Sequence, residues 1–418
     1  MPALPLDVSD LIIEILAEDL SDVPSVFSCS LVCHAFLHMC RRHIFGSVAL
    51  RCSSEERTST LNGLLSTTPV LSSYIRYLSI EGPLIISQNI IPDSTLSDTI
   101  KKFTHLRSIR LLNVCFGDGS PHDLWSSEQS GDLMRPGLLH LFHLPSLRGL
   151  RLQNCRDFSL ADLVGSNIKH LDFEYLKVLQ VPAAKLPDSS IKLQALVIGG
   201  RDNYIKDPEV YEEKCSDGKY FFDVSELKLI VLPYIGNQAD DVVVLRGLFS
   251  RCHHLEQVEL SVTNDTFSLF SPAKILVENS SIWTLKTLCI DVSGIGNDGK
   301  FDPLCGLSDE FEKMGDATAM ECLEIQCTIY YEHMSVIDWD RWSQFDKVLA
   351  QLAQSKWPKL KEVSLDIVLK SYFFQMDGDW NDDLIDALDA LDETHFQWLS
   401  STKSLEFDFF LEEHQGLY

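Results

Sequence analysis

Three groups of residues in this sequence have the types and spacing that could perform chemistry. The segment 294–299 (GIGNDG) has the glycine spacing of a dinucleotide-binding loop and follows an expected strand. The residues after it, including Phe301, Pro303 and Gly306, predict a loop in place of the helix whose N-terminus would hold the phosphates. We therefore expect a glycine-rich loop here and no nucleotide site.

The other two groups have features of metal sites. Asp377, Asp379 and Asn381 have the spacing of the first calcium ligands of an EF-hand, but Leu388 stands where the bidentate Glu is required. The Cys and His residues between 29 and 43 include two pairs that project roughly 140° apart around one helix, so they do not converge on one zinc ion. We expect an acidic helix start at the first group and buried thiols at the second. The sequence thus predicts no catalytic residue, no cofactor and no metal, and a protein that is not an enzyme.

The composition excludes several classes of function. The chain has 418 residues, of which 45% are hydrophobic and 23% charged, so we expect it to fold around a large core. Its 35 Lys and Arg against 61 Asp and Glu give a net charge of −26, which disfavours nucleic acid and membranes as partners. Twelve cysteines without a recognisable export signal indicate reduced thiols, and we expect a cytoplasmic or nuclear protein.

The start of the chain predicts a helix with an unusually wide apolar side. Asp7 is a suitable N-cap, and apolar residues recur at helical spacing from Val8 to Leu16. Once Ile13 and Leu20 are included, the apolar arc covers roughly 200°, about twice the arc that one core requires. We therefore expect this helix to contact two apolar surfaces.

Residues 1–50 resemble an F-box, especially the F-boxes of mushroom-forming fungi. The resemblance is carried by Leu4-Pro5, the apolar helix, the run 30–33 (SLVC), Phe36 and the segment 41–45 (RRHIF). It implies that this region docks onto a Skp-family adaptor, which links to a cullin and a RING ubiquitin ligase. We expect the adaptor contacts to be Leu4, Pro5, Val8, Ile12, Leu16, Val32 and Phe36. The other interpretation is a three-helix cap that packs only on its own chain.

A second pattern fills the rest of the chain. The motif Leu-x-x-Leu-x-Leu recurs from a first copy at Ile75/Leu78/Ile80 to a last copy at Leu405/Phe407. The first ten copies lie 21 to 41 residues apart, which is typical of leucine-rich repeats of irregular length. The alternation directs the Leu-type residues of each short strand inward, and the residues between them to the concave side of a curved parallel sheet.

The two patterns together predict the domain organisation. Apolar stripes within 339–352 and 380–398 indicate helices on the convex side of the sheet. We expect an α/β fold in which a short all-helical F-box (1–50) and a connecting helix or linker (51–72) precede an irregular leucine-rich-repeat solenoid (73–418).

The residues expected on the concave side change in charge along the chain. Asp172 and Glu174 begin an acidic series after two early arginines. We expect the substrate-binding residues to include Arg110, Arg151, Glu259, Asp291, Glu324 and Asp366. A concave side that is positive early and negative late favours a protein substrate with a basic segment bound at the later repeats. The other interpretation is a solvated acidic surface that keeps the protein soluble.

These patterns predict an interaction protein that performs no chemistry itself. The F-box would recruit the adaptor, and the repeats would hold a protein substrate for ubiquitin transfer by other subunits of a Skp-cullin-F-box ligase. This arrangement raises the effective concentration of substrate lysines. The alternative is a leucine-rich-repeat scaffold whose N-terminal helices cap the solenoid and that has no ligase role.

Overall fold

The computed structural model divides the chain into two compact units. Unit 1 comprises Met1–Ile191 with Lys214–Phe221, and unit 2 comprises Lys192–Glu213 with Phe222–Tyr418. The structure describes residues 5–18, 23–52, 54–82, 94–114, 135–174, 177–178, 190–199, 214–215, 218–235, 239–263, 270–293, 302, 304–330, 339–370, 386 and 388–414.

Unit 1 begins with three helices that share a small core. They are α1 (Leu6–Glu18), α2 (Val23–Ser30) and α3 (His34–Ile44). The fully buried members of the core are Ile13, Val26 and Cys40, one from each helix. Because α1 turns Ile13 inward, most of its predicted apolar stripe is left on the outside.

The rest of unit 1 is a parallel sheet of short strands. In spatial order they are β1 (Ser47–Arg51), β2 (Tyr77–Glu81), β3 (Ser108–Leu112), β4 (Gly149–Gln153) and β6 (His170–Glu174). Two short strands, β5 (Arg156–Phe158) and β7 (Lys177–Val178), pair separately. The sheet therefore begins at Ser47, before the boundary that the sequence predicts at residue 50.

Helices form a layer beside this sheet. The layer contains α4 (Glu55–Thr67), α5 (Ser94–Ile100) and α6 (Arg135–Phe142), with 3-10 turns η2 (Pro69–Ser73) and η3 (Leu160–Leu163). Because α4 packs against α5, and α5 against α6, the expected connecting helix is part of the helical layer and not a free linker.

Unit 2 repeats the same arrangement with longer strands. Its parallel sheet has the order β9 (Ala195–Gly199), β11 (Leu229–Ile235), β12 (Gln257–Thr263), β13 (Thr287–Ser293), β14 (Cys322–Tyr330), β15 (Glu362–Lys370) and β16 (Glu406–His414). The short strands β8 (Ile191–Lys192) and β10 (Phe222–Asp223) lie outside this order.

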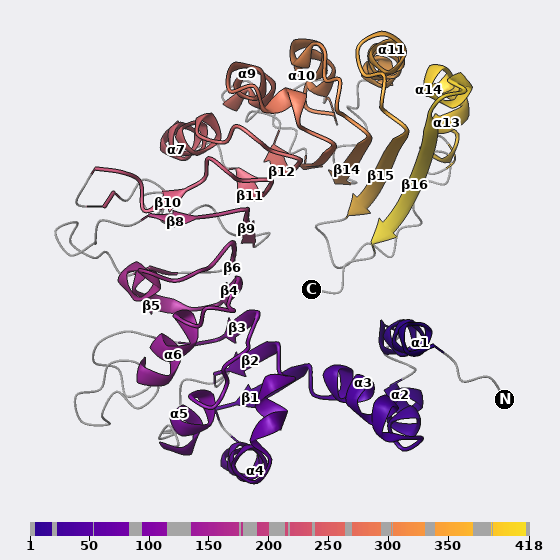
Figure 1. Cartoon of the computed structure of the whole chain (residues 1–418). Helices are drawn as coiled ribbons and strands as arrows, with labels where there is room; N and C mark the ends of the chain where they lie inside the picture. The colour runs from indigo at the N-terminus through magenta and orange to yellow at the C-terminus, as the bar shows by residue number, and fades with distance from the viewer. Residues whose placement is uncertain are drawn as a thin grey trace, which may run out of the picture. The chain divides into compact units, whose positions relative to one another are not determined.

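The helices of unit 2 lie along one side of its strands, and no described helix covers the other side, which we call the open face (Figure 1). The helices are α7 (Ala239–Ser250), α9 (Pro272–Glu278), α10 (Leu307–Met314), α11 (Trp339–Ser355), α13 (Leu391–Thr394) and α14 (Gln397–Ser401), with the 3-10 turn η6 (Ser281–Trp283). In unit 1, polar residues of β2, β3, β4 and β6 emerge on the side away from α5 and α6, and we call this side the open face of unit 1 (Figure 1).

Alternating burial explains why these segments are strands. In β3, Ile109 and Leu111 are buried and Arg110 between them is exposed. The same alternation recurs in each strand that contains part of a predicted Leu-x-x-Leu-x-Leu copy, from β2 to β15. The predicted α/β arrangement of parallel strands with helices beside them is confirmed. The sequence missed β1, whose Val48 and Leu50 lie within the F-box-like segment.

Asparagine residues end two of the strands. Asn113 and Asn154 follow β3 and β4 in the left-handed backbone region, at φ of 56° and 50°. Asn154 Nδ2 donates a hydrogen bond to Asn113 Oδ1 (2.6 Å), which links the two turns. Gly82 follows β2 at the equivalent position. A Cβ atom there would lie 2.2 Å from the carbonyl oxygen of Asn113, so only glycine fits.

Aromatic side chains fill the helical side of unit 2. The ring of Phe345 on α11 lies 5.9 Å from that of Phe311, and the ring of Trp342 lies 5.7 Å from that of Phe396. All four are fully buried, so the stripe that the sequence predicts for α11 is confirmed as packing. The stripe predicted for 380–398 is only partly right, because Trp398 at its end is more than half exposed.

Candidate docking surfaces

The N-terminal helices leave large apolar side chains in solvent. On α1, the face opposite Ile13 exposes Val8, Leu11, Ile12 and Ile15. A second set lies at the end of α2 and in the turn before α3, and it consists of Phe27, Leu31 and Val32, of which Leu31 is 86% exposed. We call these seven residues the N-terminal apolar surface. Exposed apolar side chains that cluster on one helix face mark interaction sites.

The predicted adaptor contacts are only partly on this surface. Pro5, Val8, Ile12 and Val32 are exposed as expected. Leu16 and Phe36 instead pack against the core formed by the three helices, so they support the fold of the surface without belonging to it. Leu4 lies outside the described residues.

Four exposed residues were absent from the expected contacts: Leu11, Ile15, Phe27 and Leu31. The width of the apolar arc on α1 was the signal that could have found the first two. The arc alone does not say which of its sides turns inward, and the packing of Ile13 against Val26 and Cys40 decides this.

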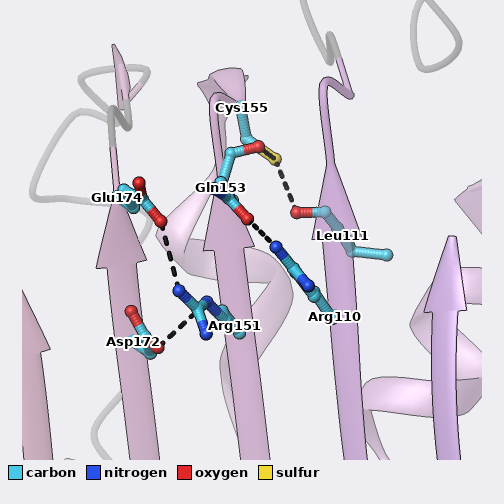
Figure 2. Close-up of polar contacts among 7 residues, drawn as sticks. All are labelled: Arg110, Leu111, Arg151, Gln153, Cys155, Asp172 and Glu174. Atoms are coloured by element: carbon cyan, nitrogen blue, oxygen red, sulfur yellow. Dashed lines mark hydrogen bonds and ion pairs between the residues drawn. The ribbon is translucent and has the colours of Figure 1, made fainter. Parts of the chain in front are cut away.

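The open face of unit 1 carries a charge network around Arg151 (Figure 2). Arg151 lies between Asp172 and Glu174 of the next strand, with its Nε 3.1 Å from Asp172 Oδ2 and its Nη2 3.2 Å from Glu174 Oε2. Arg110 donates a hydrogen bond to the side chain of Gln153. Burial raises the pKa of Asp172, while Arg151 opposes this shift.

The network changes the expectation for the early strands. Arg110 and Arg151 lie on the open face, as the sequence predicts, but the charge of Arg151 is offset by two carboxylates in the same unit. The expected positive region therefore has much of its charge neutralised within the fold. On β1 and β2, Arg51 and Glu81 are paired in the same way (2.8 Å).

The open face of unit 2 contains a hollow of about 430 Å³ across β11–β16. Among the described residues that line it, none is Lys or Arg, and six are carboxylates: Glu259, Asp291, Glu324, Glu362, Asp366 and Asp408. The four acidic residues that the sequence predicts for substrate binding all line this hollow. Glu362 and Asp408 are the other two carboxylates, and they occupy polar positions of the same alternating strand pattern on β15 and β16.

The register of the strands arranges five of these carboxylates in two rows, and the sixth, Glu362, stands outside the rows and opposite Glu406. In the first row the order from β12 to β16 is Glu259, Cys289, Glu324, Ser364 and Asp408, so an acid stands on every second strand. The residues of this row alternate between charged and neutral.

The second row lies two residues further along the strands and has the opposite phase. Its order is Ser261, Asp291, Gln326, Asp366 and Phe410. Acids therefore stand on β13 and β15, where the first row has neutral residues. We call the two rows together the acidic checkerboard.

Neutral side chains hold the carboxylates of the acidic checkerboard in place. Gln257 Nε2 donates a hydrogen bond to Glu259 Oε1 (2.8 Å), and Ser364 Oγ donates one to Asp366 Oδ1 (3.4 Å). Burial raises the pKa of Asp366 despite the hydrogen bond from Ser364. These contacts orient Glu259 and Asp366, and no described Lys or Arg pairs with either carboxylate.

Two thiols flank the central carboxylate. Cys289 Sγ donates to Glu324 Oε2 (3.3 Å), and Cys322 Sγ donates to Glu324 Oε1 (3.6 Å). Burial, with the negative charges nearby, raises the pKa of Cys289 and raises that of Cys322 to about 12. Both thiols therefore stay protonated at neutral pH and act as hydrogen-bond donors, not as nucleophiles.

A different pattern runs along the edge where the strands of unit 2 begin. The residue just before each strand from β11 to β15 is charged there, and the sign alternates from strand to strand: Lys228, Glu256, Lys286, Glu321 and Lys361. Glu256 lies 2.7 Å from Lys228 Nζ and 2.6 Å from Lys286 Nζ, and these hydrogen bonds lower its pKa to about 2. Glu321 pairs with Lys361 (3.6 Å). The acids of this edge row are thus neutralised, whereas no described Lys or Arg pairs with Glu259, Glu324, Asp366 or Asp408 of the acidic checkerboard.

Over the described residues, no group of three or more His, Cys, Asp and Glu side chains is placed to hold a metal ion. The glycine-rich segment 294–299 and the acidic group at 377–381 lie outside the described residues, whereas Leu388 is buried. Of the helices in the described part of the chain, none is long and apolar enough to cross a membrane.

Comparisons with known proteins leave the family open. No protein-family model matches the chain, and no curated protein matches it. Among solved structures, a protein from Bacteroides fragilis, determined as a structural genomics target, is similar at 12% identity and a TM-score of 0.34. That match covers 87% of this chain and 73% of the other. Such similarity is too low to assign a family or a function, so the class that the structure defines is an α/β protein of parallel strands with helices on one side.

Proposed function

We propose that this chain is the substrate-recognition subunit of a Skp-cullin-F-box ubiquitin ligase. In this proposal α1–α3 form the F-box that docks a Skp-family adaptor, and the parallel strands form a leucine-rich-repeat array that holds a protein substrate. The observation that carries it is the N-terminal apolar surface, which coincides with a segment that resembles an F-box in sequence.

The energetics of that surface favour a partner. The core of α1–α3 has only three fully buried apolar residues, which is a small core for an independent helical domain. Burial of a Leu or Ile side chain stabilises by about 1.5–3 kcal/mol, so an adaptor that covers several of the seven residues gains more than that core provides. A cap that packed only on its own chain would be expected to turn such side chains inward.

Binding of the full-length chain to a purified Skp-family adaptor tests the proposal. We expect the parent to bind, and we expect the double variant Ile12→Asp/Ile15→Asp to lose about 2–4 kcal/mol of affinity or more, because both side chains lie on the exposed face of α1. The matched control is Val243→Asp/Val277→Asp, which places the same charge on exposed apolar positions of α7 and α9.

The outcomes separate the proposal from its alternative. Calorimetry gives the affinity, and circular dichroism verifies that each variant is folded. A parent chain that does not bind the adaptor would favour a repeat scaffold with a helical cap and no ligase role. Binding that is equal for the parent and the α1 variant would contradict the assignment of the surface.

A further inference from the structure

We propose that the acidic checkerboard of unit 2 binds an extended basic segment of a partner protein, whose Lys or Arg side chains enter the hollow between the carboxylates. The inference rests on the proposed function only in identifying that partner as the ligase substrate. The surface is an interaction site on a sheet face that no described element covers.

The first argument is the contrast with other carboxylates at strand positions of the same protein. In unit 1, Asp172 and Glu174 on the open face are paired with Arg151, and at the edge of unit 2, Glu256 is paired with two lysines. The fold is therefore able to neutralise acids on its strands. In the acidic checkerboard, no described Lys or Arg pairs with the carboxylates of Glu259, Glu324, Asp366 and Asp408.

The second argument is the shape and lining of the surface. The carboxylates surround a hollow of about 430 Å³, which is larger than the volume of a single Lys or Arg side chain and open to solvent. Phe410 lies at the β16 end of the second row and is 54% exposed. An exposed aromatic ring beside Asp408 can contact the aliphatic part or the charge of a bound Arg. The site thus offers both charge and apolar contact to a basic side chain.

The third argument is the spacing of the carboxylates, which selects a direction for the bound segment. Neighbouring strands lie about 4.8 Å apart, so the acids of the first row, on β12, β14 and β16, are about 9.6 Å apart. A polyproline-II segment advances about 9.3 Å in three residues and returns to the same side. A segment that crosses the strands with a basic residue at every third position therefore matches the row.

A segment that runs along the strands fits less well. Within the hollow, β12, β13, β14 and β16 each contribute one carboxylate, and β15 contributes two, Glu362 and Asp366. A segment parallel to a strand would therefore meet at most two acids, whereas a segment across the strands meets three in the first row. The geometry points to a crossing segment.

Fluorescence anisotropy with synthetic peptides tests the inference on the full-length chain without any adaptor. The probe is a labelled twelve-residue Pro-rich peptide with Lys at every third position, and a second peptide has the same composition with its lysines adjacent. The test variant is Glu259→Gln/Glu324→Gln/Asp408→Asn. The matched control is Glu256→Gln/Glu321→Gln/Glu278→Gln, which removes three charges from the edge row and from an exposed position on α9.

We expect the parent to bind the spaced peptide, with an affinity that falls as salt increases. The checkerboard variant should bind at least tenfold more weakly, and the edge variant within about threefold of the parent. Equal weakening in both variants would show a general attraction to a negative protein and overturn the site. Absence of binding to the parent would overturn it as well, and equal binding of the two peptides would overturn the crossing geometry. The single variant Asp408→Asn repeats the comparison if the triple variant does not fold.

Failure here and failure of the proposed function are distinguishable. Adaptor binding depends on α1 and the turn before α3, and the peptide assay contains no adaptor. If the chain binds the peptide and not the adaptor, the basic-segment site is supported and the ligase role is contradicted. The reverse result supports the ligase role and contradicts the site.

Discussion

A buried carboxylate in unit 2 provides a sharp test of how the last repeat is held. Asp346 on α11 is 1% exposed, and its two oxygens accept backbone N–H groups from Trp398 (2.9 Å) and Leu399 (2.8 Å) at the start of α14. It therefore acts as an N-cap supplied by a different helix. Burial raises the pKa of Asp346, although the two N–H groups oppose this shift. We predict that Asp346→Ala releases α14 from α11.

The magnitude follows from the groups left behind. The substitution leaves two N–H groups at the start of α14 without their acceptor, and each unsatisfied buried donor costs about 1–3 kcal/mol. Removing the buried charge recovers part of its desolvation cost, so we expect a net loss of about 2–4 kcal/mol. Asp346→Asn retains one acceptor oxygen, and we expect about half of that loss.

Hydrogen exchange measured by mass spectrometry is the suitable assay, because a chain of two units need not unfold in one step. Exchange in 397–401 should accelerate strongly in Asp346→Ala. Asp340→Ala, at an exposed position on the same helix, is the control, and it should change the free energy of opening of 397–401 by less than about 1 kcal/mol. Equal effects of the two substitutions on this segment would refute the capping role.

Two further predictions concern the edge row and the last strand. Glu256 has a pKa lowered to about 2, so its ion pairs stabilise the fold above about pH 4.5 and this contribution is lost as the pH falls toward 2. Because Glu256 is partly exposed, we expect Glu256→Gln to cost less than about 1 kcal/mol at pH 7 in urea unfolding, and a difference that persists at pH 2 would contradict this. A chain ending at Lys370 loses β16 and the cover of Phe396 over Trp342, and it should aggregate or melt without cooperativity, whereas a melt like that of the full chain would show β16 to be dispensable.

The strands could be predicted because each carries its own signal. A buried pair such as Ile109 and Leu111 around a polar residue identifies a strand and its inward side without knowledge of its neighbours. β1 carries the same signal at Val48 and Leu50, but these residues also continue the F-box-like segment, so local pattern alone did not assign them to the sheet. Its parallel pairing with β2 settles the assignment.

The candidate sites could be predicted only in part, because pairing and packing are properties of the assembled fold. The sequence placed Arg151 on the open face, but its contact with Asp172 and Glu174 requires those strands to be neighbours in register. On α1, the sequence indicated two apolar surfaces without telling which residues formed the core. A core position for Ile13 became clear only from its contacts with α2 and α3.

The acidic checkerboard also explains how a sheet tolerates so many carboxylates on one face. Like charges directly opposite each other on neighbouring strands, about 4.8 Å apart, would repel by about 0.9 kcal/mol in water, which exceeds thermal energy. Alternation with Cys289 and Ser364 leaves diagonal neighbours as the nearest acids, at about 8 Å, where the repulsion is about 0.5 kcal/mol before salt screens it. In unit 1, Arg151 neutralises Asp172 and so lowers the repulsion, but the charge of Asp172 is then no longer available to a partner. Within the two rows of unit 2, spacing reduces the repulsion instead, and no described Lys or Arg neutralises Glu259, Glu324, Asp366 or Asp408.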